Sequence, residues 1–164
     1  MGVSGAGKST LGHALSQRLH CPFIEGDALH AAHSVAKMRN GIALDDADRW
    51  PWLDRIGMAL REAVREHGAA VAACSALKHS YRERLAQAYG AALSLLWLRA
   101  DENLLQLRLQ RRAGHFMPPT LLDSQLQTLQ PPAPPEHVLE LDAGHPAQVL
   151  VEEALHWLAQ AKAP

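Results

Sequence analysis

The chain opens with a glycine-rich segment that constrains its fold more than any other feature. Residues 2–9 read Gly-Val-Ser-Gly-Ala-Gly-Lys-Ser and match the phosphate-binding pattern G-x-x-x-x-G-K-S/T at every fixed position. Such glycines let the backbone curl so that several N–H groups point at phosphate oxygens. The segment therefore predicts a binding site for a nucleoside triphosphate with Mg²⁺.

Each residue of this loop has an expected task. The lysine of the pattern, Lys8, reaches the β and γ phosphates and takes part in catalysis, and the Ser9 hydroxyl ligates Mg²⁺. The nucleotide-binding residues predicted from the loop are Gly2, Val3, Ser4, Gly5, Ala6, Gly7, Lys8, Ser9 and Thr10.

The rest of the chain alternates short apolar runs with helical patterns. Strands are predicted at 22–24, 69–74, 93–98 and 137–141, and helices at 8–20, 30–40, 50–67, 80–89, 101–112, 121–129 and 146–161. This alternation predicts an α/β fold in three layers, a parallel sheet flanked by helices. We expect one domain over residues 1–164, with a small inserted lid at about 112–132, where glycine and proline interrupt the helical pattern.

Only Met1 precedes the phosphate loop, although such a loop normally follows a buried strand. The first central strand of the sheet is therefore expected to be missing from this chain. We expect the native product to begin about 5 to 15 residues upstream, with a strand rich in Val and Ile.

Composition excludes several classes of partner. Sixteen basic and seventeen acidic residues give a formal charge of −1, which argues against general binding to nucleic acid or an anionic membrane. No apolar run approaches the about 20 residues of a membrane span. Cys21 and Cys74 are far apart and make no metal or redox spacing, so they are expected to be reduced thiols in the cytoplasm.

Two carboxylates follow the predicted strand at 22–24. Glu25 and Asp27 come at its carboxyl end, where open α/β sheets bind ligands. A kinase needs a carboxylate to receive the proton of the acceptor hydroxyl, and the GTPase motif Asn-Lys-x-Asp is absent from the chain. We expect Asp27 to bind the acceptor and accept its proton, and Glu25 to contact the metal; the alternative is that Asp27 only caps the following helix.

The sequence resembles the gluconate kinases of the shikimate-kinase-like P-loop group. The resemblance runs nearly end to end, and its specific parts are Asp-Arg-Trp-Pro-Trp at 48–52, Ala-Cys-Ser-Ala-Leu-Lys at 73–78, and the stretch 114–125 that begins Gly-His-Phe-Met-Pro. It implies a P-loop kinase fold, a homodimer, and transfer of the ATP γ-phosphoryl group to the 6-hydroxyl of D-gluconate. Glu25 stands where the family more often has Asp. Because Glu is one methylene longer than Asp, a water-mediated contact from Glu25 to the metal would differ in geometry from the family's contact.

An acceptor that carries a carboxylate gives the basic residues candidate roles. The guanidinium of Arg49 matches a carboxylate, although it could instead pair with Asp45 or Asp46 on the surface. Lys78 and Arg82 follow a predicted strand, where a loop faces the ligand crevice. His30 could bind a polyol hydroxyl or be an ordinary histidine at a helix start.

Three arginines precede the predicted lid. Arg108, Arg111 and Arg112 lie at the end of the helix at 101–112, from which a closing lid can bring cations onto the phosphates. Arg112 matches the family position best and is the predicted catalytic cation, with Arg108 and Arg111 as further nucleotide ligands; a solvated helix face is the alternative. Two other functions stay open for the chain, a sister kinase such as shikimate kinase and a nucleotide-binding remnant without turnover.

Overall fold

The computed structural model describes residues 1–111 and 120–160, apart from the side chains of Arg111 and Thr120. Its strands are β1 (Phe23–Glu25), β2 (Val71–Ala73), β3 (Leu95–Arg99) and β4 (Val138–Asp142). Its helices are α1 (Lys8–Leu19), the 3₁₀ turn η1 (Gly26–Leu29), α2 (Ala32–Arg39), α3 (Asp46–His67), α4 (His79–Tyr89), α5 (Glu102–Arg111), α6 (Thr120–Thr128) and α7 (Ala147–Gln160). The alternation of strands and helices follows the sequence prediction.

The long helix α3 begins at Asp46, earlier than the residue 50 that the sequence predicts. Asp45 accepts a hydrogen bond from the Asp48 N–H at 2.8 Å, and the Asp48 carboxylate accepts one from the Asp45 N–H at 3.2 Å. This reciprocal cap satisfies N–H groups that the first turn would leave without partners. Pro51 consequently lies inside the helix, not in its first turn.

The strands form two parallel pairs, β1 with β2 and β3 with β4. The backbone of the first two residues lies between these pairs. The Met1 amino group donates to the Leu96 carbonyl, the Leu98 N–H donates to the Met1 carbonyl at 3.0 Å, and the Gly2 N–H donates to the Ser75 carbonyl at 3.1 Å. Met1 and Gly2 thus connect the end of β2 to β3 just before the phosphate loop.

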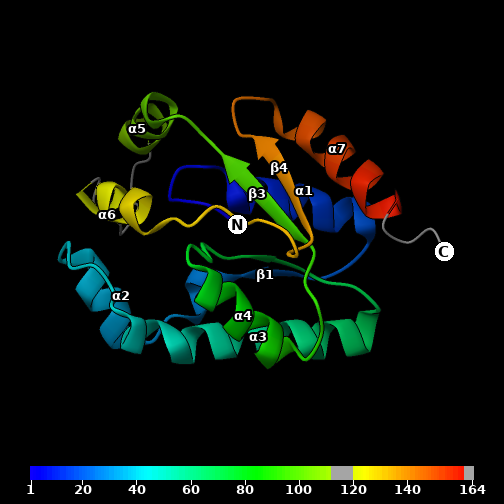
Figure 1. Ribbon diagram of the computed structural model, residues 1–164, viewed down its shortest axis with the longest axis horizontal. Coiled ribbons are helices and arrows are strands. Elements are labelled where there is room, and N and C mark those ends of the chain that lie inside the picture. The colour runs from blue at the N-terminus through cyan, green and yellow to red at the C-terminus, as the bar shows by residue number, and fades with distance from the viewer. Residues whose placement is uncertain (112–119, 161–164) are drawn as a thin grey trace.

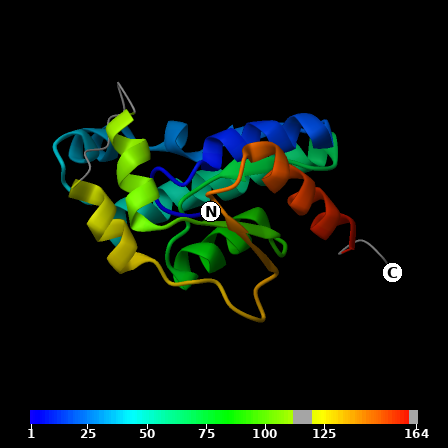
Figure 2. The ribbon, with the colours of Figure 1, turned by 90° about the horizontal axis from the view of Figure 1, so that it is seen from above.

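Helices cover the strands on both sides. Helices α3 and α4 lie on one side and α1 and α7 on the other, while α5 and α6 lie together at one end (Figures 1 and 2). Within the described residues, no helix is long and apolar enough to cross a membrane. The parallel pairs and their helical layers confirm the predicted three-layer α/β fold.

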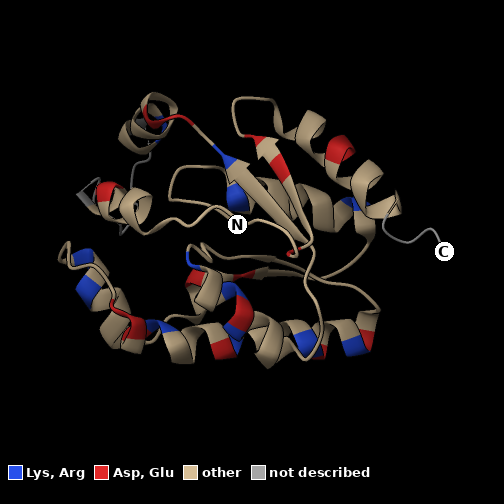
Figure 3. Ribbon diagram, viewed as in Figure 1, with Lys and Arg blue, Asp and Glu red and all other residues tan. Residues whose placement is uncertain are grey.

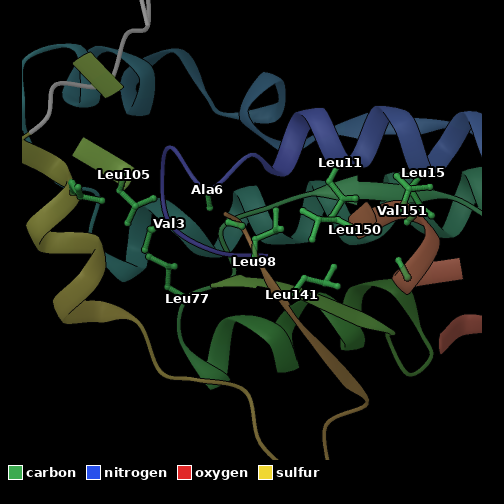
Figure 4. Packing of buried hydrophobic residues seen from close by; sticks show 13 residues of the cluster. Val3, Ala6, Leu11, Leu15, Leu77, Leu98, Leu105, Leu141, Leu150 and Val151 are labelled. Carbon is green, nitrogen blue, oxygen red and sulfur yellow. The ribbon is translucent and has the colours of Figure 1, made fainter. Parts of the chain in front are cut away.

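The phosphate loop is packed into the larger hydrophobic cluster. Val3 and Ala6, both almost fully buried, share this cluster with Leu11, Leu98 and Leu105. In the close view, Val3 lies between Leu105 of α5 and Leu77, which precedes α4 (Figure 4). Apolar contacts therefore fix the loop's position while its polar backbone stays at the edge of the core.

Helix α6 also packs against the core, although the sequence predicts it to be part of an inserted lid. Leu122 is 3% exposed and belongs to the same cluster as Val3, and Leu121 packs with Met38 and Leu44. The predicted lid at 112–132 therefore contains a packed helix in its second half. Its first half, residues 112–119, lies outside the described residues.

Candidate active site

A cleft opens beside the phosphate loop, and segments distant in sequence line it. Its polar lining residues include Ser4 and Lys8 of the loop, Asp27 and His30 after β1, Arg49 of α3, and Gln125 of α6. A second cleft on the far side of the loop is lined by Gly7, Thr10, Arg108 and the turn that joins β4 to α7. The phosphate loop therefore separates two clefts.

The loop has the backbone conformation that phosphate binding requires. Gly2, Gly5 and Gly7 all have positive φ, and Gly7, at φ 100°, immediately precedes α1. A side chain is disfavoured at such φ values. Lys8 Nζ donates to the Val3 carbonyl at 3.0 Å, so the lysine folds back across its own loop.

Arg108 of α5 reaches the carbonyl side of the loop. Its Nη1 donates to the Ala6 carbonyl at 3.3 Å, and its Nη2 donates to the Ala143 carbonyl at 2.7 Å. The guanidinium thus joins the phosphate loop to the turn after β4 and lines the second cleft. This places a predicted nucleotide ligand beside the loop, where it also holds the backbone in position.

Asp27 lies in η1, which α3 holds by two hydrogen bonds. Trp52 Nε1 donates to the Gly26 carbonyl at 2.7 Å, and Arg55 Nε donates to the Leu29 carbonyl at 2.8 Å. Gly26 is required there because a Cβ would lie 2.3 Å from the Ala73 carbonyl oxygen. The carboxylate of Asp27 is therefore presented to the cleft from a fixed turn.

His30 stacks on Trp52 in the cleft wall, with ring centroids 4.2 Å apart and an interplanar angle of 12°. Its Nδ1 is buried and has no hydrogen-bond partner among the described residues. Burial lowers the pKa of His30 to about 4. His30 is consequently a neutral imidazole at physiological pH.

Arg49 presents a guanidinium whose terminal nitrogens make no hydrogen bond with the described residues. Its Nε donates to the Leu44 carbonyl at 3.2 Å, and its Cζ lies 5.4 Å from the centroid of the Tyr81 ring. The main-chain bond and the ring contact orient the fork. Acidic and basic residues are interspersed along α3, the helix that carries Arg49 (Figure 3). The arrangement leaves Nη1 and Nη2 for a carboxylate ligand.

Lys78 is paired beside the cleft. Its Nζ donates to both Asp46 carboxylate oxygens, at 2.8 and 3.0 Å, and the Tyr81 hydroxyl also donates to Asp46. The hydrogen bond from Lys78 holds the pKa of Asp46 below its usual range. Lys78 therefore neutralises Asp46 next to Arg49, and it is not among the residues that line the cleft.

Arg82 requires a correction, because the structure places it away from the cleft. The residue is 3% exposed, and its Nε and Nη2 donate to the Glu136 carboxylate at 2.6 and 3.0 Å. Its Nη1 donates to the carbonyls of Ala76, Leu77 and Gln130. Arg82 is thus a buried cross-link between α4 and the segment after α6, not a group that faces a ligand.

The remaining predicted site residues are Glu25, Ser9, Arg111 and Arg112, and the structure says less about their surroundings. Glu25 ends β1, is partly buried, and is not among the residues that line the cleft. Ser9 lies in the first turn of α1. Within residues 1–111 and 120–160, no group of three His, Cys, Asp or Glu side chains could hold a metal ion. The Arg111 side chain and all of Arg112 lie outside the described residues, so their roles stay predictions.

Sequence reasoning assigned no role to Gln125, which the structure brings to the phosphate loop. Gln125 Oε1 accepts a hydrogen bond from the Ser4 N–H at 2.6 Å. The only sequence signal was its position at the end of the segment 114–125, which helps to carry the family resemblance.

Known proteins match the chain over nearly its whole length. A family model described as an AAA domain matches residues 1–132. The gluconokinase of Gluconobacter oxydans (strain 621H) is 47% identical over 163 residues, covering 98% of this chain and 90% of the relative. The thermosensitive gluconokinase of Escherichia coli (strain K12) is 39% identical over 154 residues, with 93% and 82% covered.

Solved structures agree with these relatives. A gluconokinase from Sinorhizobium meliloti 1021 superposes with a TM-score of 0.86 at 43% identity, covering 98% of this chain and 90% of that chain. An unliganded sugar kinase from Janibacter sp. HTCC2649 gives a TM-score of 0.89 at 40% identity, covering 97% and 91%.

The ion pair between buried Arg82 and partly buried Glu136 should govern stability, not ligand affinity. Arg82→Met removes the guanidinium that pairs with Glu136 and leaves that carboxylate only the Ala133 N–H and His79 as polar neighbours among the described residues, so the free energy of unfolding should fall by about 3 kcal/mol. Urea denaturation measures it, and Arg82→Met/Glu136→Leu should recover part of the loss. An Arg82→Met protein of normal stability with a raised KM for one substrate would instead return Arg82 to the ligand site.

Neutral His30 should make the fold sensitive to acid. Its folded pKa of about 4 lies below the ordinary value of 6.5, so its contribution to stability is present above pH 6.5 and is lost as pH falls toward 4. His30→Phe keeps a ring against Trp52 and should flatten the fall in melting temperature over this range. Replacement of exposed His67 by Asn is the control, and an unchanged pH profile in His30→Phe would contradict the assignment.

Proposed function

Because this chain belongs to the gluconokinase family, we propose that it transfers the γ-phosphoryl group of ATP to the 6-hydroxyl of D-gluconate, giving 6-phospho-D-gluconate. One observation carries the proposal. A single cleft brings together Lys8 of the phosphate loop, the carboxylate of Asp27 and the open fork of Arg49. These are the groups needed to meet a phosphoryl donor, a reacting hydroxyl and an acceptor carboxylate.

ATP binds along the phosphate loop. The loop N–H groups and Lys8 hold the phosphates, and the nucleoside lies in the second cleft, beside Arg108. The Ser9 hydroxyl, with Glu25 through water, would hold Mg²⁺, because a hydroxyl and phosphate oxygens suit this hard cation. Bound Mg²⁺ supplies neutralisation of the phosphate charge. Arg111 and Arg112 are proposed to add positive charge over the phosphates.

Gluconate binds in the first cleft with its carboxylate on Arg49. Neutral His30 hydrogen-bonds a hydroxyl of the chain, and Lys78 balances Asp46 so that this carboxylate does not repel the acceptor. Asp27 accepts the proton of the 6-hydroxyl as the new oxygen–phosphorus bond forms and the bond to the leaving ADP breaks. Lys8 stays on the phosphate oxygens throughout.

Two expectations accompany this assignment. Cys21 and Cys74 are free thiols, which fits the reducing cytoplasm, where we expect the protein to act. A homodimer stays a prediction from the family resemblance.

A coupled assay of ADP release tests the proposed acceptor. Purified protein is supplied with MgATP and, in parallel, with D-gluconate, shikimate, another sugar acid or no acceptor. Turnover with gluconate well above the other reactions is expected. Turnover with shikimate alone would assign the chain to a sister kinase such as shikimate kinase. ATP binding without turnover in any reaction would identify a nucleotide-binding protein that has no kinase activity.

Removal of the Arg49 fork should weaken gluconate binding selectively. We expect Arg49→Ala to raise the KM for gluconate by about 10- to 150-fold, the equivalent of about 1.5 to 3 kcal/mol for a charge-assisted contact. The KM for ATP should change little. Arg49→Lys should recover only part of the affinity, since an ammonium lacks the planar fork.

Arg61→Ala is the matched control, because Arg61 lies exposed on the same helix. It should leave both KM values unchanged. If Arg49→Ala also leaves the gluconate KM unchanged, the carboxylate is bound elsewhere in the cleft.

Loss of the Asp27 carboxylate should stop chemistry without preventing ATP binding. Asp27→Asn keeps the size of the side chain but is a poor proton acceptor, so kcat should fall by about 100- to 10,000-fold. The dissociation constant for ATP, measured by calorimetry, should stay within about threefold of wild type, because Asp27 is proposed to contact the acceptor hydroxyl and not ATP. Near-normal kcat would remove Asp27 from the catalytic groups.

A further inference from the structure

Helix α6 lines the proposed acceptor cleft, and its apolar side chains fix its position. Leu121 packs with Met38 and Leu44, and Leu122 packs in the cluster that contains Val3. Gln125 lies one turn after Leu121, so the two side chains share a face of the helix. Both line the cleft. The packing therefore delivers the Gln125 carboxamide to the phosphate loop.

The group that Gln125 contacts belongs to the phosphate-binding machinery. Gln125 Oε1 accepts a hydrogen bond from the N–H of Ser4, the third residue of the loop, at 2.6 Å. Ser4 and Lys8 line the acceptor cleft, whereas Gly7 and Thr10 line the nucleoside side. The contact consequently lies on the side of the loop where the terminal phosphate must meet the acceptor.

A carboxamide can both accept and donate hydrogen bonds at this position. Its oxygen accepts a hydrogen bond, as it does here from Ser4, and its nitrogen carries two N–H donors. A phosphate oxygen takes the Ser4 N–H when nucleotide binds, because loop N–H groups favour anions. The carboxamide then turns its donors toward the same phosphate oxygens.

We propose that Gln125 is a ligand of the transferred phosphoryl group, contributed by α6 from above the acceptor cleft. The inference rests on the proposed kinase function and adds a donor that the loop itself does not supply. Charge spreads over the three equatorial oxygens during transfer, so a neutral N–H donor held there stabilises the transition state. The oxygen bond to Ser4 keeps the carboxamide in place before nucleotide arrives.

Gln125→Glu gives the sharpest test. The glutamate retains an oxygen that can accept from the Ser4 N–H, and thermal melting checks that the variant folds. It lacks the N–H donors and adds negative charge facing the phosphoryl group. We expect kcat to fall by about 100-fold or more, the scale of a lost donor to a developing oxyanion. Affinity for β,γ-imido-ATP should weaken far more than affinity for ADP, which has no terminal phosphate.

Gln130→Glu is the matched control. Gln130 Oε1 also accepts from a backbone N–H, that of His79 at 2.8 Å, but Gln130 does not line the cleft. Its substitution should leave kcat and the ratio of the two affinities at wild-type values. Should Gln125→Glu fail to fold, Gln125→Met removes the polar groups at similar size, and the same loss of kcat with unchanged ADP affinity is expected.

The binding comparison separates this inference from the proposed acceptor. If wild type does not turn over gluconate but Gln125→Glu still discriminates against β,γ-imido-ATP, the acceptor is wrong and the role of Gln125 stands. Wild-type kcat in Gln125→Glu would overturn the role. An equal loss of affinity for ADP and the imido analogue would also overturn it, because the contact would then be structural only.

Discussion

The site depends on how the backbone of the phosphate loop is held. Three glycines with positive φ make the loop intrinsically costly to order, so contacts from outside must fix it. Met1 and Gly2 hydrogen-bond to β3 and Ser75, Val3 and Ala6 are buried in the core, and Arg108 binds the Ala6 carbonyl. These contacts use the apolar and carbonyl sides of the loop. Within the loop, the N–H groups of Gly2 and Ser4 are already bonded to Ser75 and Gln125, and we propose that the N–H groups nearer α1 bind the phosphates.

The two clefts beside the loop contain different predicted ligand groups. Arg108 lines the cleft proposed for the nucleoside, and Asp27, His30 and Arg49 line the cleft proposed for the acceptor. The acceptor groups are positioned by α3, through the Trp52 bond to η1 and the Arg49 bond to the Leu44 carbonyl. Helix α3 therefore holds the predicted acceptor ligands at one side of the phosphate loop.

Local patterns in the sequence predicted the fold, because apolar periodicity depends on neighbouring residues and located the strands and helices. The loop pattern and the following Asp27 pointed to two segments that the structure brings into one cleft, and the roles of these residues stay predictions. The predicted start of α3 at residue 50 was wrong by four residues, because the cap formed by Asp45 and Asp48 begins the helix at Asp46.

Long-range pairing could not be predicted in the same way. Arg82 meets Glu136 across 54 positions, and Gln125 meets Ser4 across 121 positions. A surface cation and a buried cross-link look alike in one sequence, because only the fold decides which carboxylate lies within reach. Arg82 was therefore assigned to a ligand that it does not face, and Gln125 was passed over.

The most direct measurement of this account is a crystal structure of the protein with D-gluconate and β,γ-imido-ATP bound together. The gluconate carboxylate should lie on Nη1 and Nη2 of Arg49, and the 6-hydroxyl should lie within hydrogen-bond distance of Asp27, facing the terminal phosphate across Lys8. A gluconate bound with its carboxylate away from Arg49, or with its 6-hydroxyl away from Asp27, would contradict this assignment.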